Sequence, residues 1–140
     1  MLIKQISDFI SKEALAVIAT VHADGSGSES ALIAFSNDEE LNLVFGTSNE
    51  TRKYRNIQSN NRVAFVIGWN PAMGSLQYEG VATEVPESDK EKYAALLTNR
   101  NPGAKKFAES PSQRYFVVKP TWARLTDNAG SPPGVHEITF

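Results

Sequence analysis

A chain of 140 residues has room for one hydrophobic core of ordinary size, and its lack of cysteine rules out disulfides and thiolate metal sites. A net charge of -2 and a pI of about 5.7 argue against general attraction to nucleic acid or to anionic membranes. We therefore expect a single domain over residues 1–140, with neither nucleic acid nor a membrane as its partner.

Residues 1–13 carry apolar side chains at helical spacing. Leu2, Ile6 and Ile10 recur about one turn apart, which predicts an amphipathic helix. Charged residues interrupt this segment, so it does not resemble a secretory signal. The chain also has no run of the roughly 18 to 20 apolar residues that would cross a bilayer. We expect a cytoplasmic protein.

Segments rich in β-branched residues, separated by turns with Gly, Asn or Pro, predict strands. They occupy residues 14–23, 29–36, 41–47, 62–69, 75–85, 113–119 and 121–127, with a short edge strand at the C-terminal end. The strands at 113–119 and 121–127 are expected to be separate because Pro120 lies between them. Helices are expected at residues 47–60 and 88–100. Six or seven strands in this order predict a closed or partly closed antiparallel barrel with accessory helices.

The segment 52–62 holds Arg52, Lys53, Arg55 and Arg62 and contains no acid. Thr47 and Glu50 have the spacing of a capping box, so we expect the helix to begin at Thr47, or at residue 49 if that asparagine is the cap. A helix start followed at once by a hydroxyl and two cations suits a phosphate monoester. From these residues alone, a solvated basic helix face is favoured over an anion site, and a nucleic-acid patch is disfavoured by the overall charge.

Other chemistries find little support in the sequence. His22 and His136 are far apart and lie in no ligand-spaced motif, so no metal site is predicted. Neither Ser28 nor Ser30 lies in the strand–turn–helix motif of a nucleophilic serine. The acidic residues 38–40 form a predicted hairpin turn, and "DGSGS" lacks the GKS/T ending of a phosphate loop.

Four segments in the correct order resemble the pyridoxamine 5′-phosphate oxidase-like FMN-binding split β-barrels, in particular their general stress protein and flavin oxidoreductase branch. These segments are "LAVIATVHADGSGSESALIAF", "LVFGTSNETRKYRNIQSNNRVAF", "YEGVATEV" and "RYFVVKPTWARLTD". The resemblance covers almost the whole chain. It implies a mainly β (α+β) fold, an antiparallel split β-barrel of six or seven strands with accessory helices.

The resemblance also implies a homodimer that binds two FMN molecules at the subunit interface. In this sequence the FMN phosphate would be held by Thr51, Arg52 and Lys53, with Thr47 nearby. The isoalloxazine ring would be lined by Ser30, Ala31, Leu32 and Ile33, and either Ser75 or Gln77 would reach the ring. Trp122 and Arg124 of the partner subunit would complete the site.

Two departures from the family pattern bear on activity. Asn61 stands where the family usually has proline, and no Lys or Arg follows Arg124. The family's true pyridoxamine 5′-phosphate oxidases bind the substrate phosphate partly through basic residues near the C-terminus, so that activity is not expected. We expect an FMN-dependent oxidoreductase acting on a small molecule, with the cofactor and no named side chain as the catalytic group. The alternatives are a non-catalytic flavin-binding stress or sensor protein, and the same fold binding a deazaflavin.

Overall fold

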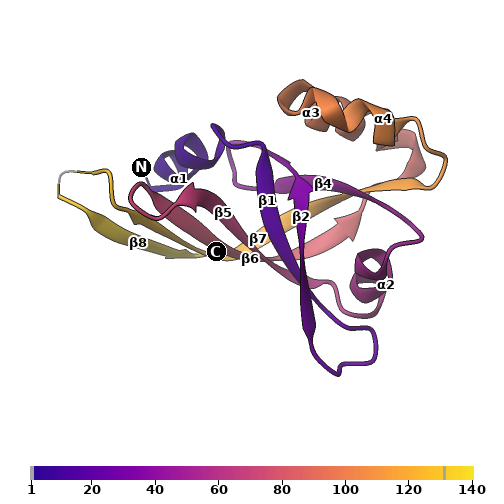
Figure 1. Ribbon diagram of the computed structural model, residues 1–140, viewed down its shortest axis with the longest axis horizontal. Helices are drawn as coiled ribbons and strands as arrows, with labels where there is room; N and C mark the ends of the chain where they lie inside the picture. Colours follow the sequence, from indigo (N-terminus) through magenta and orange to yellow (C-terminus); the bar gives the residue numbers. More distant parts are fainter. Residues whose placement is uncertain (1, 131) are drawn as a thin grey trace.

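An antiparallel sheet of eight strands forms most of the computed structural model, which describes residues 2–130 and 132–140 (Figure 1). The strands are β1 (Leu15–Val21), β2 (Ser28–Ala34), β3 (Ser36–Asn37), β4 (Leu43–Ser48), β5 (Arg62–Asn70), β6 (Gly74–Glu84), β7 (Gln113–Asp127) and β8 (Gly134–Thr139). They follow the order β2-β1-β5-β6-β7-β4-β3, and β8 pairs with β7. The sheet curls into a half-barrel, which confirms the predicted split β-barrel class with accessory helices.

Four helices lie outside this sheet in the described part of the chain: α1 (Leu2–Ile10), α2 (Arg52–Ser59), α3 (Lys90–Arg100) and α4 (Lys105–Ala108). The predicted N-terminal helix is confirmed, and its Ile6 and Ile10 are fully buried in the barrel core. Helix α2 lies beside the β1–β2 hairpin, while α3 and α4 lie together near β4 (Figure 1). Among the residues that the structure describes, no helix has the length and apolar character needed to cross a bilayer.

The barrel core follows the two-residue alternation of the strands. In β5, for example, Val63, Phe65 and Ile67 are buried, whereas Val66 on the opposite face is exposed. Four aromatic rings pack one against the next through the interior, in the order Phe116, Phe45, Phe65 and Tyr78. The buried hydroxyl of Tyr78 donates to the carbonyl oxygens of Leu41 and Val118, and burial raises its pKa, so it stays a neutral donor.

The prediction that Pro120 separates two strands is wrong. Strand β7 runs unbroken through it, because the β6–β7 register shifts at this point: Glu79 pairs with Trp122, but Gly80 pairs with Pro120. Thr121 is therefore the extra residue of a bulge, where a proline without an N–H is tolerated. The single long β7, the two-residue β3 and the confirmed C-terminal β8 account for the difference from the predicted strand count.

Candidate functional site

Helix α2 begins later than the sequence pattern predicts. Thr47 and Ser48 continue β4 and pair with β7, so the expected helix start at Thr47 or Asn49 is wrong. Thr51 is the N-cap, and its hydroxyl accepts the N–H of Tyr54 at 3.2 Å and donates to the carbonyl of Ser48 at 3.0 Å. The hydroxyl oxygens of Thr47 and Thr51 lie 2.9 Å apart. The strand end and the helix start thus form one polar corner.

Two side chains fix this corner against the barrel. Tyr54 packs edge-on against Phe116, with ring centroids 5.8 Å apart, and its hydroxyl donates to Glu84 at 2.6 Å. Ile57, one turn later, is buried in the core. Both contacts show that this face of α2 is turned toward the barrel. Because Arg52 and Lys53 are the first two residues of α2, their backbone N–H groups have no intrahelical acceptor.

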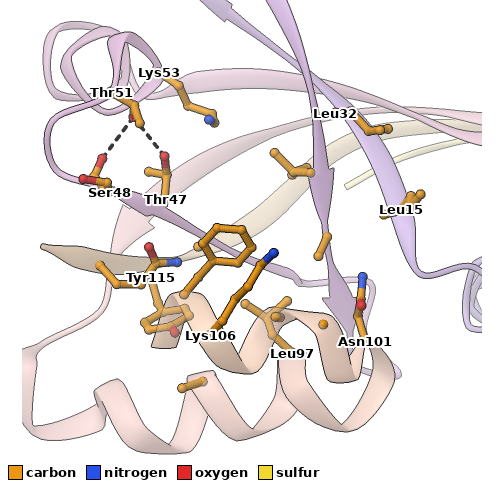
Figure 2. A pocket seen from close by; sticks show the side chains of 18 residues that line it. Leu15, Leu32, Thr47, Ser48, Thr51, Lys53, Leu97, Asn101, Lys106 and Tyr115 are labelled. Atoms are coloured by element: carbon orange, nitrogen blue, oxygen red, sulfur yellow. Dashed lines mark hydrogen bonds between the residues drawn. The ribbon is translucent and has the colours of Figure 1, made fainter. Parts of the chain in front are cut away.

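A cavity of about 510 Å³ opens beside this corner, within the size range of small-molecule sites (Figure 2). Its polar end consists of Thr47, Ser48, Thr51 and Lys53. Apolar walls come from β1, β2, β7 and α3, through Leu15, Leu32, Ile33, Ala34, Ala94, Leu97 and Tyr115. Residues 101–107 close the remaining side through Asn101, Gly103, Ala104, Lys106 and Phe107. The cavity therefore offers a cationic, hydroxyl-lined end to a largely apolar interior.

Lys53 is the main charged group at this end. Its side chain is half-buried, and its amine points into the cavity (Figure 2). Burial lowers the pKa of Lys53, and the nearby Glu29 carboxylate opposes that shift. Lys53 forms no ion pair with any described residue, and no described Asp or Glu lines this cavity. A half-buried ammonium of this kind favours an anionic ligand.

A second cavity, of about 310 Å³, lies between the start of α2 and strand β2. It shares Thr51 and Lys53 with the larger cavity. Its other lining residues are Ile18, Thr20, Glu29, Ser30, Ala31 and Arg52. The start of α2 therefore borders both spaces, and the smaller one contains a carboxylate.

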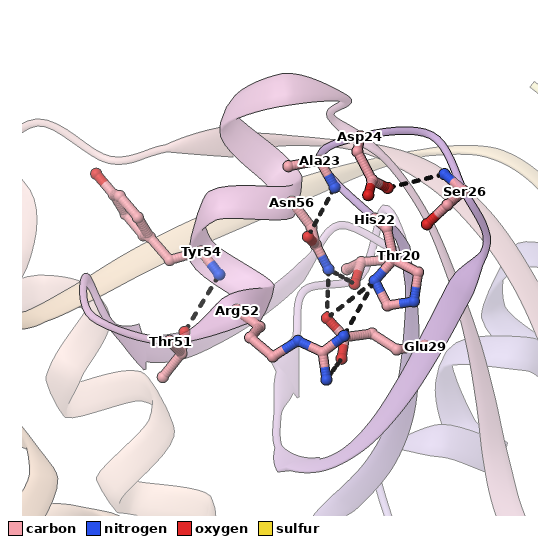
Figure 3. A network of polar contacts seen from close by, with 10 residues as sticks. All are labelled: Thr20, His22, Ala23, Asp24, Ser26, Glu29, Thr51, Arg52, Tyr54 and Asn56. Atoms are coloured by element: carbon pink, nitrogen blue, oxygen red, sulfur yellow. Dashed lines mark hydrogen bonds and ion pairs between the residues drawn. The ribbon is translucent and has the colours of Figure 1, made fainter.

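Arg52 is directed toward the β1–β2 hairpin (Figure 3). One terminal nitrogen, Nη1, lies 3.3 Å from Oε2 of Glu29, and the other, Nη2, lies 3.3 Å from Nδ1 of His22. The residue expected to hold a phosphate beside Lys53 is thus already engaged by two side chains of the same subunit.

Most of the residues predicted for a flavin site gather around these two cavities. Leu32, Ile33, Thr47, Thr51 and Lys53 line the larger one, and Ser30, Ala31 and Arg52 line the smaller one. The other three lie elsewhere: Ser75 and Gln77 on β6, and Trp122 on β7, line neither cavity. Within one subunit they are not part of the site.

The sequence reasoning missed the wall formed by residues 101–107 and the partners of Arg52. Nothing in the pattern of the "NPGAKKF" segment points to a cavity. The position of Glu29 could have been recognised from the sequence. In the two-residue alternation of β2 it lies on the same face as Ala31 and Ile33, which is the inward-facing one. An inward-facing acid requires a partner, and Arg52 is that partner.

Comparison with known proteins places this geometry in a family. The family described as "Pyridoxamine 5'-phosphate oxidase" matches residues 2–127. The chain belongs to the pyridoxamine 5′-phosphate oxidase family. A pyridoxine/pyridoxamine 5′-phosphate oxidase from Bordetella pertussis is 28% identical over 76 residues, which cover 54% of this chain and 36% of that protein. The chain thus matches only about a third of the length of this curated relative.

Solved structures show the fold of the pyridoxamine 5′-phosphate oxidase family at low sequence identity. General Stress Protein 26 from Bacillus anthracis superposes with a TM-score of 0.73 at 20% identity, covering 99% of this chain and 100% of that one. A heme binding protein from Mycobacterium smegmatis superposes with a TM-score of 0.83 at 14% identity, covering 99% of this chain and 58% of that one. Proteins named for different functions therefore share this fold, so the fold alone does not determine the function of this chain.

Proposed function

We propose that the protein binds FMN in the larger cavity, with the phosphate at the start of α2. The observation that carries this proposal is the half-buried ammonium of Lys53, which has no ion-pair partner among the described residues and lies beside the Thr51 cap and the N–H groups of the first helical turn. A helix N-terminus with an adjacent cation and hydroxyls is a general arrangement for phosphate binding. The residues present therefore fit the phosphate end of FMN.

The rest of the cavity suits a flat, mostly apolar ring. Leu32 and Ile33 from β2 and Leu97 from α3 form its walls, and Gln113 and Asn101 offer amide groups. FMN, when bound, supplies hydride or electron transfer, while the protein binds and orients it. We propose a flavin-dependent oxidoreductase that acts on a small molecule. No described Asp, Glu or His lines the larger cavity, which also keeps a non-catalytic flavin-binding protein as the second candidate.

Heme is a less suitable ligand for this chain. A heme iron commonly takes an axial histidine. His22 lies on the β1–β2 hairpin against Arg52, and His136 lies on β8, so neither borders the larger cavity. This placement supports a flavin over heme.

The functional unit is proposed to be a homodimer. Leu15, Val17, Leu32 and Val66 lie on the outer face of the sheet, and we call this set the outer apolar face. Val17 pairs with both Leu32 and Val66, so these three side chains form one row across three strands. Leu32 is 62% exposed and Val66 is 40% exposed. Leu15 and Leu32 also line the larger cavity, so a second copy on this face would help to enclose the ligand.

Replacing Val66 with arginine is expected to convert the dimer to a monomer, because it places a charge on the outer apolar face, at the β5 end of the row formed with Leu32 and Val17. Sedimentation velocity at micromolar concentration measures the mass directly. The matched control is Leu96→Arg, since Leu96 is 41% exposed on α3, is not on the sheet, and does not line the larger cavity. A native protein that sediments as a monomer, or a Val66→Arg protein that stays dimeric, would contradict the assignment.

Titration of the purified chain with FMN, riboflavin and hemin tests the proposed ligand. We expect FMN to be retained on ultrafiltration with a shifted absorbance spectrum, riboflavin to bind more weakly, and hemin to show no saturable site. Anaerobic mixing of the FMN complex with reduced nicotinamide then separates the two candidates: an oxidoreductase bleaches the flavin, and a carrier does not. A colourless protein that takes up no FMN would overturn the proposal.

A further inference from the structure

The two cations at the start of α2 have different surroundings. Lys53 faces both cavities without an ion-pair partner among the described residues. Arg52 is 65% exposed but is held by Glu29 and His22, as described above. Only one of the two cations is therefore available to an incoming phosphate.

Glu29 itself is fixed by a buried network (Figure 3). Asn56, which is 4% exposed, donates through Nδ2 to the Glu29 carboxylate and, at 3.0 Å, to the hydroxyl of Thr20. The Oδ1 atom of Asn56 accepts the backbone N–H of Ala23 at 3.1 Å. The Glu29 side chain is only 23% exposed. Its carboxylate is thus a fixed feature of the smaller cavity, and Arg52 is the more exposed partner.

The geometry determines which part of the guanidinium is occupied. An arginine binds an oxyanion most strongly with two parallel N–H groups. In Arg52 both terminal nitrogens are engaged on the hairpin side, Nη1 by Glu29 and Nη2 by His22. A phosphate at the start of α2 would have to compete with the Glu29 carboxylate for this group. An arginine positioned in advance for phosphate would present these nitrogens to the cavity instead.

We propose that Glu29 is a specificity-determining residue, which limits phosphate affinity by holding Arg52 away from the anion site. This inference rests on the proposed function and refines it. The phosphate is held by Lys53, Thr51 and the first helical turn. Arg52 instead links α2 to the β1–β2 hairpin through Glu29 and His22. Among the described residues at the start of α2, Lys53 is then the one cation free to hold the phosphate monoester, and removal of Glu29 adds Arg52 as the second.

The test is a double-mutant cycle on FMN affinity. Glu29→Gln keeps an oxygen acceptor for Asn56 but removes the charge that holds Arg52. We expect FMN to bind about tenfold tighter, as for a new charge-assisted contact, and riboflavin affinity to stay within about twofold. The gain should vanish in the double variant Glu29→Gln/Arg52→Gln. In the native background, Arg52→Gln should change FMN affinity by less than about threefold, because this guanidinium is already occupied.

Glu50→Gln is the matched control. Glu50 is an exposed acid just before the N-cap of α2 and lines neither cavity. Removing it changes the net charge by the same amount, so an FMN gain equal to that of Glu29→Gln would mean that general electrostatics is responsible and would overturn the inference.

Each outcome of the cycle decides the matter. Unchanged or weaker FMN binding by Glu29→Gln, or a gain that persists without Arg52, would overturn the inference. So would a loss of tenfold or more from Arg52→Gln alone, a result that does not depend on how Glu29→Gln folds. A native chain that binds no FMN, beside a Glu29→Gln protein that does, would remove the proposed function and leave the inference standing. If neither protein binds FMN, both fail.

Discussion

Replacing Lys53 with methionine is expected to weaken FMN binding by about 10- to 150-fold, while riboflavin affinity changes little. Methionine preserves the apolar stem of this half-buried side chain and removes only its charge. Hydrogen bonds to charged groups contribute about 1.5–3 kcal/mol, and each 1.4 kcal/mol is a tenfold change in affinity. Fluorescence titration of both flavins with the native and variant proteins measures the difference.

Arg55→Met is the control for this experiment. Arg55 lies on the same helix, and its guanidinium donates to the backbone oxygen of Glu50 at 3.1 Å. It lines neither the larger nor the smaller cavity, so its loss should change FMN affinity by less than about threefold. Equal losses of FMN and riboflavin in Lys53→Met would show that the phosphate lies elsewhere.

Replacing Gly74 with alanine is expected to lower the free energy of unfolding by about 2–6 kcal/mol. Gly74 begins β6 with a φ of +118°, a conformation that L side chains rarely adopt, and this strain alone costs about 1–3 kcal/mol. A Cβ here would also overlap the backbone carbonyl oxygen of Thr126, which cannot move without disturbing β7, and such overpacking costs about 1–3 kcal/mol more. Urea unfolding measures the loss.

Gly25→Ala separates these two causes. Gly25 has a φ of +75°, but a Cβ at this exposed turn would meet no atom within 4 Å. We expect a loss of about 1 kcal/mol, which reports the backbone strain without the clash. If both variants unfold at the same urea concentration, the predicted overlap with β7 is wrong.

Much of the fold was predictable because strands and helices each place apolar residues in the sequence at a characteristic spacing. The N-terminal helix was found from apolar residues one helical turn apart, and the β1–β2 hairpin from two segments rich in β-branched residues on either side of a glycine-containing turn. The error at Pro120 has a different origin. A bulge is a property of two paired strands, and the β6 partner that accommodates it cannot be recognised from the β7 segment alone.

The candidate site was predictable to a smaller extent. The segment was singled out by its charge, and Thr51 and Lys53 in it border both cavities. The predicted helix start is wrong, because the capping-box spacing of Thr47 and Glu50 competes with the pairing of β4 with β7, and the pairing prevails. The direction of Arg52 depends on Glu29, which is distant in sequence and approaches only when the hairpin folds against α2. Local sequence patterns do not report contacts between distant residues. Only the structure shows that Arg52 is paired with Glu29, whereas Lys53 has no ion-pair partner among the described residues.

Backbone amide shifts in nitrogen-15 correlation spectra test the central claim most directly. The claim is that the FMN phosphate lies at the start of α2. The difference between the FMN-loaded and riboflavin-loaded spectra isolates the phosphate, because the two ligands share the ring and ribityl chain. We expect the largest differences on the amides of Thr51, Arg52 and Lys53. Differences centred on α1 or β8, or none anywhere, would contradict it.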